Sequence, residues 1–120
     1  MSIEYSLNYC KGWVFDESTF NEFRNILEKS DDDDWFYDEF SDYYIRPING
    51  WGGYDEGVFV GVSEYLGEDC FCITIDQLAI FDDNLQNDIL DFCKKISEHK
   101  GVIEFLHNYP TNTFIINFCY

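Results

Sequence analysis

Basic side chains are scarce in this sequence. Only 7 of the 120 residues are Lys or Arg, whereas 24 are Asp or Glu, so the formal net charge at pH 7 is −17. Contacts with nucleic-acid phosphates and with anionic membrane surfaces depend on cations, so this composition argues against direct binding to either. The partner that suits such a chain is a basic protein.

Long apolar segments and targeting signals are also absent. No run of apolar residues approaches the roughly 18 that a membrane-spanning helix needs. The opening segment Met1–Ser6 lacks the basic region and the apolar stretch of a secretory signal peptide. We therefore expect a cytoplasmic protein without membrane contact.

A disulfide framework is not indicated. The five cysteines form an odd number, and several lie within apolar segments such as Phe71-Cys72-Ile73 and Phe118-Cys119-Tyr120. Thiols stay reduced in the cytoplasm, and buried thiols pack as small apolar groups. We expect all five cysteines to be free.

The sequence has no motif for nucleophilic catalysis. A catalytic thiol or hydroxyl needs a base beside it. The two histidines, His99 and His107, are expected at the end of a helix and within a strand, and the sequence indicates no partner for either. With 24 acidic residues, carboxylate pairs of the kind used in glycoside hydrolysis arise by chance, and no sugar-binding context accompanies them. We expect a protein that is not an enzyme.

Metal and phosphate sites are not indicated either. Cys70 and Cys72 are too close in sequence for a zinc knuckle. The run Asp31–Asp34 opens like a calcium loop, but the glycine and the glutamate that an EF-hand needs further along are missing. The glycines of Gly50-Trp51-Gly52-Gly53 are not followed by the Lys-Ser/Thr of a phosphate loop. No metal and no cofactor are expected.

Apolar and aromatic residues, by contrast, are abundant. They make up 46% and 20% of the chain respectively. Charged chains that stay disordered lack such hydrophobic content, so this chain should fold. At this length the default is one domain, spanning residues 1–120.

Residue periodicity predicts an α+β domain. The first expected helix has a capping pair at Thr19 and Glu22, and the second has one at Asp83 and Gln86. The fold should be a mostly antiparallel sheet of about five strands with two helices packed on it. The expected strands are Ile3–Phe15, Val58–Leu66, Cys70–Ile75, Val102–Tyr109 and Thr113–Tyr120, and the expected helices are Glu17–Lys29 and Asp83–Gly101.

Glycine and proline set further expectations for the backbone. Gly12 should bend or end the first strand, because glycine weakens strand interiors. The stretch Arg46–Gly53 contains Pro47 and three glycines, so it is expected to be irregular.

Acidic and aromatic residues are concentrated in the segment Asp31–Tyr44. It contains seven acids, six aromatic residues and no base, and ten further acids lie between Arg46 and Lys94 without one Lys or Arg. Uncompensated carboxylates speed association with a basic partner, while Tyr and Trp dominate interface hot spots. The predicted partner-binding residues are Asp31, Asp32, Asp33, Asp34, Trp35, Tyr37, Asp38, Glu39, Asp42, Tyr43, Tyr44, Asp55, Glu56, Glu68 and Asp69.

The same segment has a structural interpretation. Trp35, Phe36 and Phe40 have the spacing of core residues in a short helix, and a run of charge is commonly a solvated face. Solubility alone, however, needs a net charge of only about 2 to 8 on a small domain, and a larger excess destabilises the folded state through self-repulsion. The size of the excess therefore favours a binding role.

In size, acidity, aromatic richness and lack of a catalytic motif, the chain resembles bacterial immunity proteins. These are small acidic cytoplasmic partners encoded beside colicin-type, contact-dependent-inhibition and other polymorphic toxins. The resemblance implies one-to-one binding to a basic cognate toxin, most simply a nuclease, with its active site or an adjacent nucleic-acid-binding surface covered.

Two alternatives stay open at this point. A phage-type nucleic-acid mimic, such as an anti-restriction or anti-CRISPR protein, would carry regularly spaced carboxylates along a rod. A small ligand-binding domain or enzyme would instead have an apolar pocket, for which Trp13, Trp51 and Tyr54 are the candidate lining residues.

Overall fold

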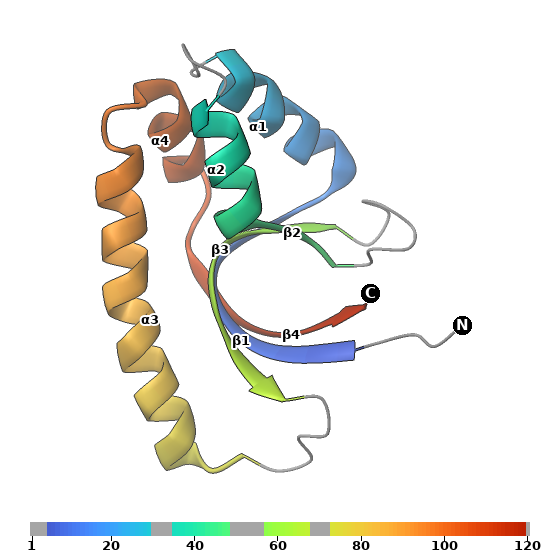
Figure 1. Cartoon of the computed structure of the whole chain (residues 1–120), viewed down its shortest axis with the longest axis vertical. Coiled ribbons are helices and arrows are strands. Elements are labelled where there is room, and N and C mark those ends of the chain that lie inside the picture. The colour runs from blue at the N-terminus through green and yellow to red at the C-terminus, as the bar shows by residue number, and fades with distance from the viewer. Residues whose placement is uncertain (1–4, 30–34, 49–56, 68–72, 120) are drawn as a thin grey trace.

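Figure 1 shows the fold in a computed structural model, which describes residues 5–29, 35–48, 57–67 and 73–119. The strands within these ranges form one antiparallel sheet in the order β2-β3-β1-β4. The predicted α+β class with an antiparallel sheet is confirmed. In chain order the elements are β1 (Tyr5–Phe15), α1 (Glu17–Lys29), α2 (Trp35–Tyr44), β2 (Ile45–Pro47), β3 (Val58–Gly67), α3 (Ile75–Ile96), α4 (Lys100–His107) and β4 (Asn112–Cys119).

The sheet is strongly curved, and the helices cover its convex face (Figure 1). The long helix α3 runs along this face and contacts both β1 and β3, while α1 contacts α4. Helices α1, α2 and α4 gather at one end of α3. The concave face lies between the two edge strands, β2 and β4.

Two facing glycines allow β1 and β3 to lie unusually close together. Gly12 pairs with Gly61 in the register of the two strands, and their φ angles are 154° and 146°. A Cβ on Gly12 would collide with the carbonyl oxygen of Val60, and a Cβ on Gly61 with that of Lys11. β1 continues through Gly12 to Phe15, so this glycine does not end the strand.

Helix α1 has the predicted bounds, Glu17–Lys29, but its cap is Asp16 and not Thr19. The Thr19 backbone N–H donates to Asp16 Oδ1 at 2.7 Å, and this hydrogen bond lowers the pKa of the Asp16 carboxyl. The predicted apolar stripe is confirmed, since Phe20, Phe23 and Leu27 are buried.

Helix α3 begins earlier than the sequence predicted. Ile75 is its first residue, so the predicted strand Cys70–Ile75 is wrong in its described part, residues 73–75, while residues 68–72 lie outside the described ranges. Thr74 and Gln77 form a capping box: the Gln77 N–H donates to Thr74 Oγ1 at 3.1 Å, and the Thr74 N–H donates to Gln77 Oε1 at 2.9 Å. This start signal outweighs the strand preference of the β-branched residues around it, and the predicted cap Asp83 lies inside the helix.

The predicted strand Val102–Tyr109 is also wrong, because Lys100–His107 form helix α4. Val102 and Leu106 are one helical turn apart and buried, and Phe105 lies against Phe23 with ring centroids 5.6 Å apart. Strand β4 consequently pairs with β1 and not with a hairpin partner. His107 ends a helix instead of lying in a strand.

The described residues therefore contain four helices and four strands, where two helices and about five strands were expected. The additional helices are α2 and α4. Strand β2, in a segment expected to be irregular, pairs with β3 at an edge of the sheet. Pro47 is compatible with this position because an edge strand needs no second ladder of hydrogen bonds.

Aromatic rings fill the core between the helices and the convex face. The Phe92 ring of α3 lies 5.9 Å from Trp13, 5.6 Å from Phe40 and 4.8 Å from Tyr44, measured between centroids. Phe40 also lies 5.9 Å from Phe23 of α1 and is only 2% exposed. The interpretation of Phe40 as a core residue of a short helix is confirmed, and α2 is fixed to α1 and α3 through these rings.

A smaller apolar cluster of Cys10, Phe59, Ile116 and Phe118 lies on the concave face. The guanidinium carbon of Arg46 in β2 lies 4.1 Å from the centre of the Phe118 ring in β4, so the two edge strands approach each other across this face. Burial raises the pKa of the Cys10 thiol to about 12. Cys10 and Cys93, the cysteines whose side chains are described, are both free.

Candidate partner-binding surface

The structure places some of the predicted partner-binding residues and not others. Asp31–Asp34, Asp55, Glu56, Glu68 and Asp69 lie outside the described residues. Trp35 and Tyr37 lie in the first turn of α2, where only the backbone is described. The remaining predicted residues follow on the same helix with described side chains: Asp38, Glu39, Asp42, Tyr43 and Tyr44.

Helix α2 separates a core side from an exposed side. Phe40 and Tyr44, one turn apart, both contact Phe92 of α3. Asp38 and Asp42, also one turn apart, are exposed, and Tyr43 is 71% exposed. The helix therefore presents two carboxylates and a tyrosine ring to solvent while its apolar side stabilises the fold.

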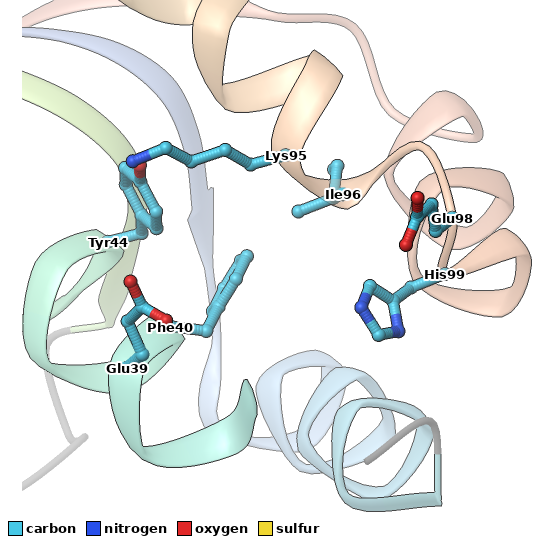
Figure 2. Close-up of a pocket in the computed structure, with 7 residues that line it drawn as sticks. All are labelled: Glu39, Phe40, Tyr44, Lys95, Ile96, Glu98 and His99. Carbon is cyan, nitrogen blue, oxygen red and sulfur yellow. The ribbon is translucent and has the colours of Figure 1, made fainter. Parts of the chain in front are cut away.

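A hollow of about 300 Å³ lies between α2 and the C-terminal end of α3, and we name it the α2–α3 pocket. Phe40 and Ile96 are buried and give it an apolar base. Figure 2 shows the Glu39 carboxylate beside Phe40 on the α2 side and Glu98 at the far side, beyond the end of α3. The residues that line the pocket are Glu39, Phe40, Tyr44, Lys95, Ile96, Glu98 and His99.

A second hollow of about 290 Å³ adjoins this pocket, because Tyr44 and Lys95 line both. It extends toward β3 and is lined by Tyr43, Tyr44, Val62, Ser63, Asp88, Asp91 and Lys95. The polar and aromatic lining residues of the two hollows make up one continuous area. We call it the α2–α3 surface: Glu39, Tyr43, Tyr44, Asp88, Asp91, Lys95, Glu98 and His99.

Lys95 is the one lysine of this surface, and its side chain extends toward Tyr44 (Figure 2). The ammonium nitrogen lies 5.7 Å from the centre of the Tyr44 ring, within the range of a cation–π contact. Its pKa is raised mainly by the Tyr44 side chain, through a hydrogen bond and a charge interaction, and to a smaller extent by the carboxylates of Glu39 and Asp91. The surface thus favours a positive charge at this point.

Carboxylates outnumber cations on the α2–α3 surface. Four acids, Glu39, Asp88, Asp91 and Glu98, face a single lysine. Elsewhere, the described side chains form one ion pair with each other, in which Lys11 Nζ lies 3.4 Å from Asp82 Oδ1. The residues that line the α2–α3 surface therefore carry a net negative charge, which suits a basic partner.

The sequence prediction missed the α3 contribution to this surface. Asp88 and Asp91 lie within the stretch without bases that precedes Lys94, and the spacing of three places them on one face of a helix. That spacing was readable from the sequence. Their position beside Tyr43 and Tyr44 depends on how α2 packs on α3, for which the sequence held no local signal.

The structure also bears on the ligand pocket, the metal site and the membrane-spanning segment that the sequence analysis considered. Trp13 packs in the core, where its indole N–H donates to the Tyr109 carbonyl oxygen at 3.0 Å, and it also lines a hollow of about 230 Å³. Trp51 and Tyr54 lie outside the described residues. Within the described ranges, no group of three or more His, Cys, Asp or Glu residues could hold a metal ion. No helix in that part of the chain is long and apolar enough to cross a membrane.

Comparison of the chain with models of protein families, with curated proteins and with solved structures finds no match. The assignment of a function therefore depends on the physical properties of the surface itself.

Proposed function

We propose that this protein is an acidic inhibitor of the immunity-protein type, which binds and neutralises a basic protein in the cytoplasm. The partner is a cognate toxin, most simply a nuclease, whose active site or nucleic-acid-binding surface becomes covered. Inhibition arises from binding alone, without an enzymatic reaction, a cofactor or a metal.

The observation that carries this proposal is the α2–α3 surface. The exposed Tyr43 ring and the half-buried Tyr44 ring lie among four carboxylates, and the surface has one lysine. Carboxylates around an aromatic centre combine long-range attraction of a basic partner with a rigid, low-entropy contact area. A nucleic-acid mimic is expected to carry regularly spaced carboxylates along a rod, and that arrangement does not require exposed tyrosine rings among the carboxylates.

The charge of the whole chain supports the same proposal. A net charge of −17 destabilises a small domain through self-repulsion and repels nucleic acid, so it needs a function that benefits from it. Nuclease surfaces that hold nucleic acid are necessarily basic. An acidic protein can occupy such a surface in place of the nucleic acid.

The experiment measures binding to the purified product of the reading frame beside the one that encodes this chain. We expect the association rate to fall about tenfold or more as salt rises from about 0.05 to 0.5 M, because salt screens exposed charges. The double variant Asp88→Asn/Asp91→Asn should slow association further than Asp76→Asn/Asp83→Asn, a control on the same helix with the same change of net charge. An association rate independent of salt, or retention of DNA or RNA by this chain, would contradict the proposal.

A further inference from the structure

We propose that the α2–α3 pocket is the receptor for a single arginine side chain that projects from the partner. The identity of the occupant rests on the proposed function, whereas the chemistry of the pocket does not. Three properties of the lining support this assignment: its size, its apolar walls and the position of its charges.

The pocket is small, which favours a compact group over an extended ligand. Its volume of about 300 Å³ is at the lower limit of small-molecule sites, which span about 300 to 1,000 Å³. It is bounded by α2 on one side and by the C-terminal end of α3 with the following turn on the other (Figure 2). A larger ligand would extend into the adjoining hollow toward β3.

The walls suit the two chemically different parts of an arginine. Buried Phe40 and Ile96 offer an apolar base against which the methylene groups of the side chain can pack. The Tyr44 ring also lines the pocket, and a planar guanidinium can stack on such a ring. Arginine fits this combination better than lysine, whose ammonium is compact and more strongly hydrated.

The charges of the pocket select a cation. Glu39 and Glu98 lie on opposite sides of the pocket, so a guanidinium inside it would be attracted by a carboxylate on each side (Figure 2). Lys95 shows that a cation is already stabilised beside Tyr44, since its ammonium lies 5.7 Å from the ring centre and its pKa is raised there. An entering arginine would be attracted by the two glutamates and repelled by Lys95.

The inference is tested with N-acetyl-arginine amide as the probe and its uncharged isostere N-acetyl-citrulline amide as the control. Backbone amide resonances are followed in ¹H–¹⁵N correlation spectra during titration of the full chain. We expect the arginine compound to shift the resonances of Phe40, Tyr44, Ile96 and His99 in a saturable manner, and the citrulline compound to leave them unchanged. Equal shifts from the two compounds, or shifts spread over the acidic surface without preference for the pocket, would overturn the inference.

Matched variants refine the test. Glu39→Gln/Glu98→Gln should weaken binding of the arginine probe about five- to tenfold, whereas Asp76→Asn/Asp83→Asn, with the same change of charge, should change it less than about twofold. Lys95→Gln should strengthen binding of the arginine probe. Lys94→Gln should have a smaller effect, because Lys94 is exposed and does not line the pocket. Unchanged cross-peak dispersion shows that each variant is folded. The assignment would be contradicted if the two double variants changed the affinity for the probe equally, or if the two lysine variants did.

Failure of this inference is distinguishable from failure of the proposed function. If the probe binds in the pocket but the product of the neighbouring reading frame does not bind the chain, the proposed function is wrong and the receptor for a cationic side chain stands. If that product binds Glu39→Gln/Glu98→Gln as tightly as the parent, the proposed function stands and the arginine receptor is wrong.

Discussion

Truncation of Phe40 and of Tyr43 should have opposite consequences, although both are aromatic residues of helix α2. Phe40 is 2% exposed and contacts the rings of Phe23, Tyr44 and Phe92 at centroid distances of 5.4 to 5.9 Å. Tyr43 is 71% exposed, and its described ring contact is with Tyr44 at 6.4 Å. The first ring serves the core, and the second is available to a partner.

The magnitudes follow from this difference in burial. Phe40→Ala leaves a cavity among three rings and should lower the free energy of unfolding by about 3 to 5 kcal/mol. Tyr43→Ala removes a ring that is already largely in water, so the free energy of unfolding should change by less than about 0.5 kcal/mol. If Tyr43 is an interface anchor, its loss should cost about 2 kcal/mol of binding, roughly 30-fold in Kd.

The assay combines urea unfolding of the free variants with binding kinetics on the partner. Tyr43→Phe is the control that keeps the ring and removes the hydroxyl. A Phe40→Ala variant that loses less than about 1 kcal/mol would show that α2 does not pack on α3 as described. A Tyr43→Ala variant that is destabilised as strongly as Phe40→Ala would refute the division of the helix into a core side and a binding side.

Three further predictions concern the fold. Gly12→Ala and Gly61→Ala should each lower the free energy of unfolding by about 2 to 6 kcal/mol, because the new Cβ meets backbone atoms of the facing strand at a strained φ. Urea unfolding measures this change. A loss below about 1 kcal/mol would contradict the close approach of β1 and β3. Burial raises the Cys10 pKa from 9.0 to about 12, so unfolded chains release this thiol proton at lower pH than folded ones, and the free energy of unfolding should fall as pH rises from about 9 to 12. Cys10→Ala should remove this part of the pH dependence, which is measured as the urea midpoint at each pH. The same pH dependence in the parent and in Cys10→Ala would show that the thiol is not buried. Thr74→Ala should lower the free energy of unfolding by about 1 kcal/mol, measured by thermal unfolding, because it removes the hydroxyl that caps α3. Thr74→Ser is the control, since it keeps the capping hydroxyl.

Helices and strands whose own residues form a clear periodic or compositional pattern were predictable from the sequence. Helix α1 has the predicted bounds because Phe20, Phe23 and Leu27 form an unbroken apolar stripe, and β3 and β4 are rich in β-branched and aromatic residues with turn residues beside them. The segment of α4 was misassigned because its short apolar run fits either a strand or a helix, and burial of Val102 and Leu106 decides between them only in the folded chain.

The candidate site was predictable only in part, for a related reason. Glu39, Tyr43 and Tyr44 stood out because acidic and aromatic residues crowd together around them in the sequence. Asp88 and Asp91 reach the same surface through the packing of Phe40 and Tyr44 on Phe92, a contact between distant segments. Local patterns do not encode such contacts, so the hollows could not be foreseen.

The central claim is that this chain neutralises a basic toxin by binding it one to one. The most direct test measures the activity of the purified product of the neighbouring reading frame, assayed as a nuclease, while this chain is added in increasing molar ratio. The proposal predicts that activity declines linearly and is lost when the two proteins are equimolar. Full activity in the presence of excess chain would contradict it.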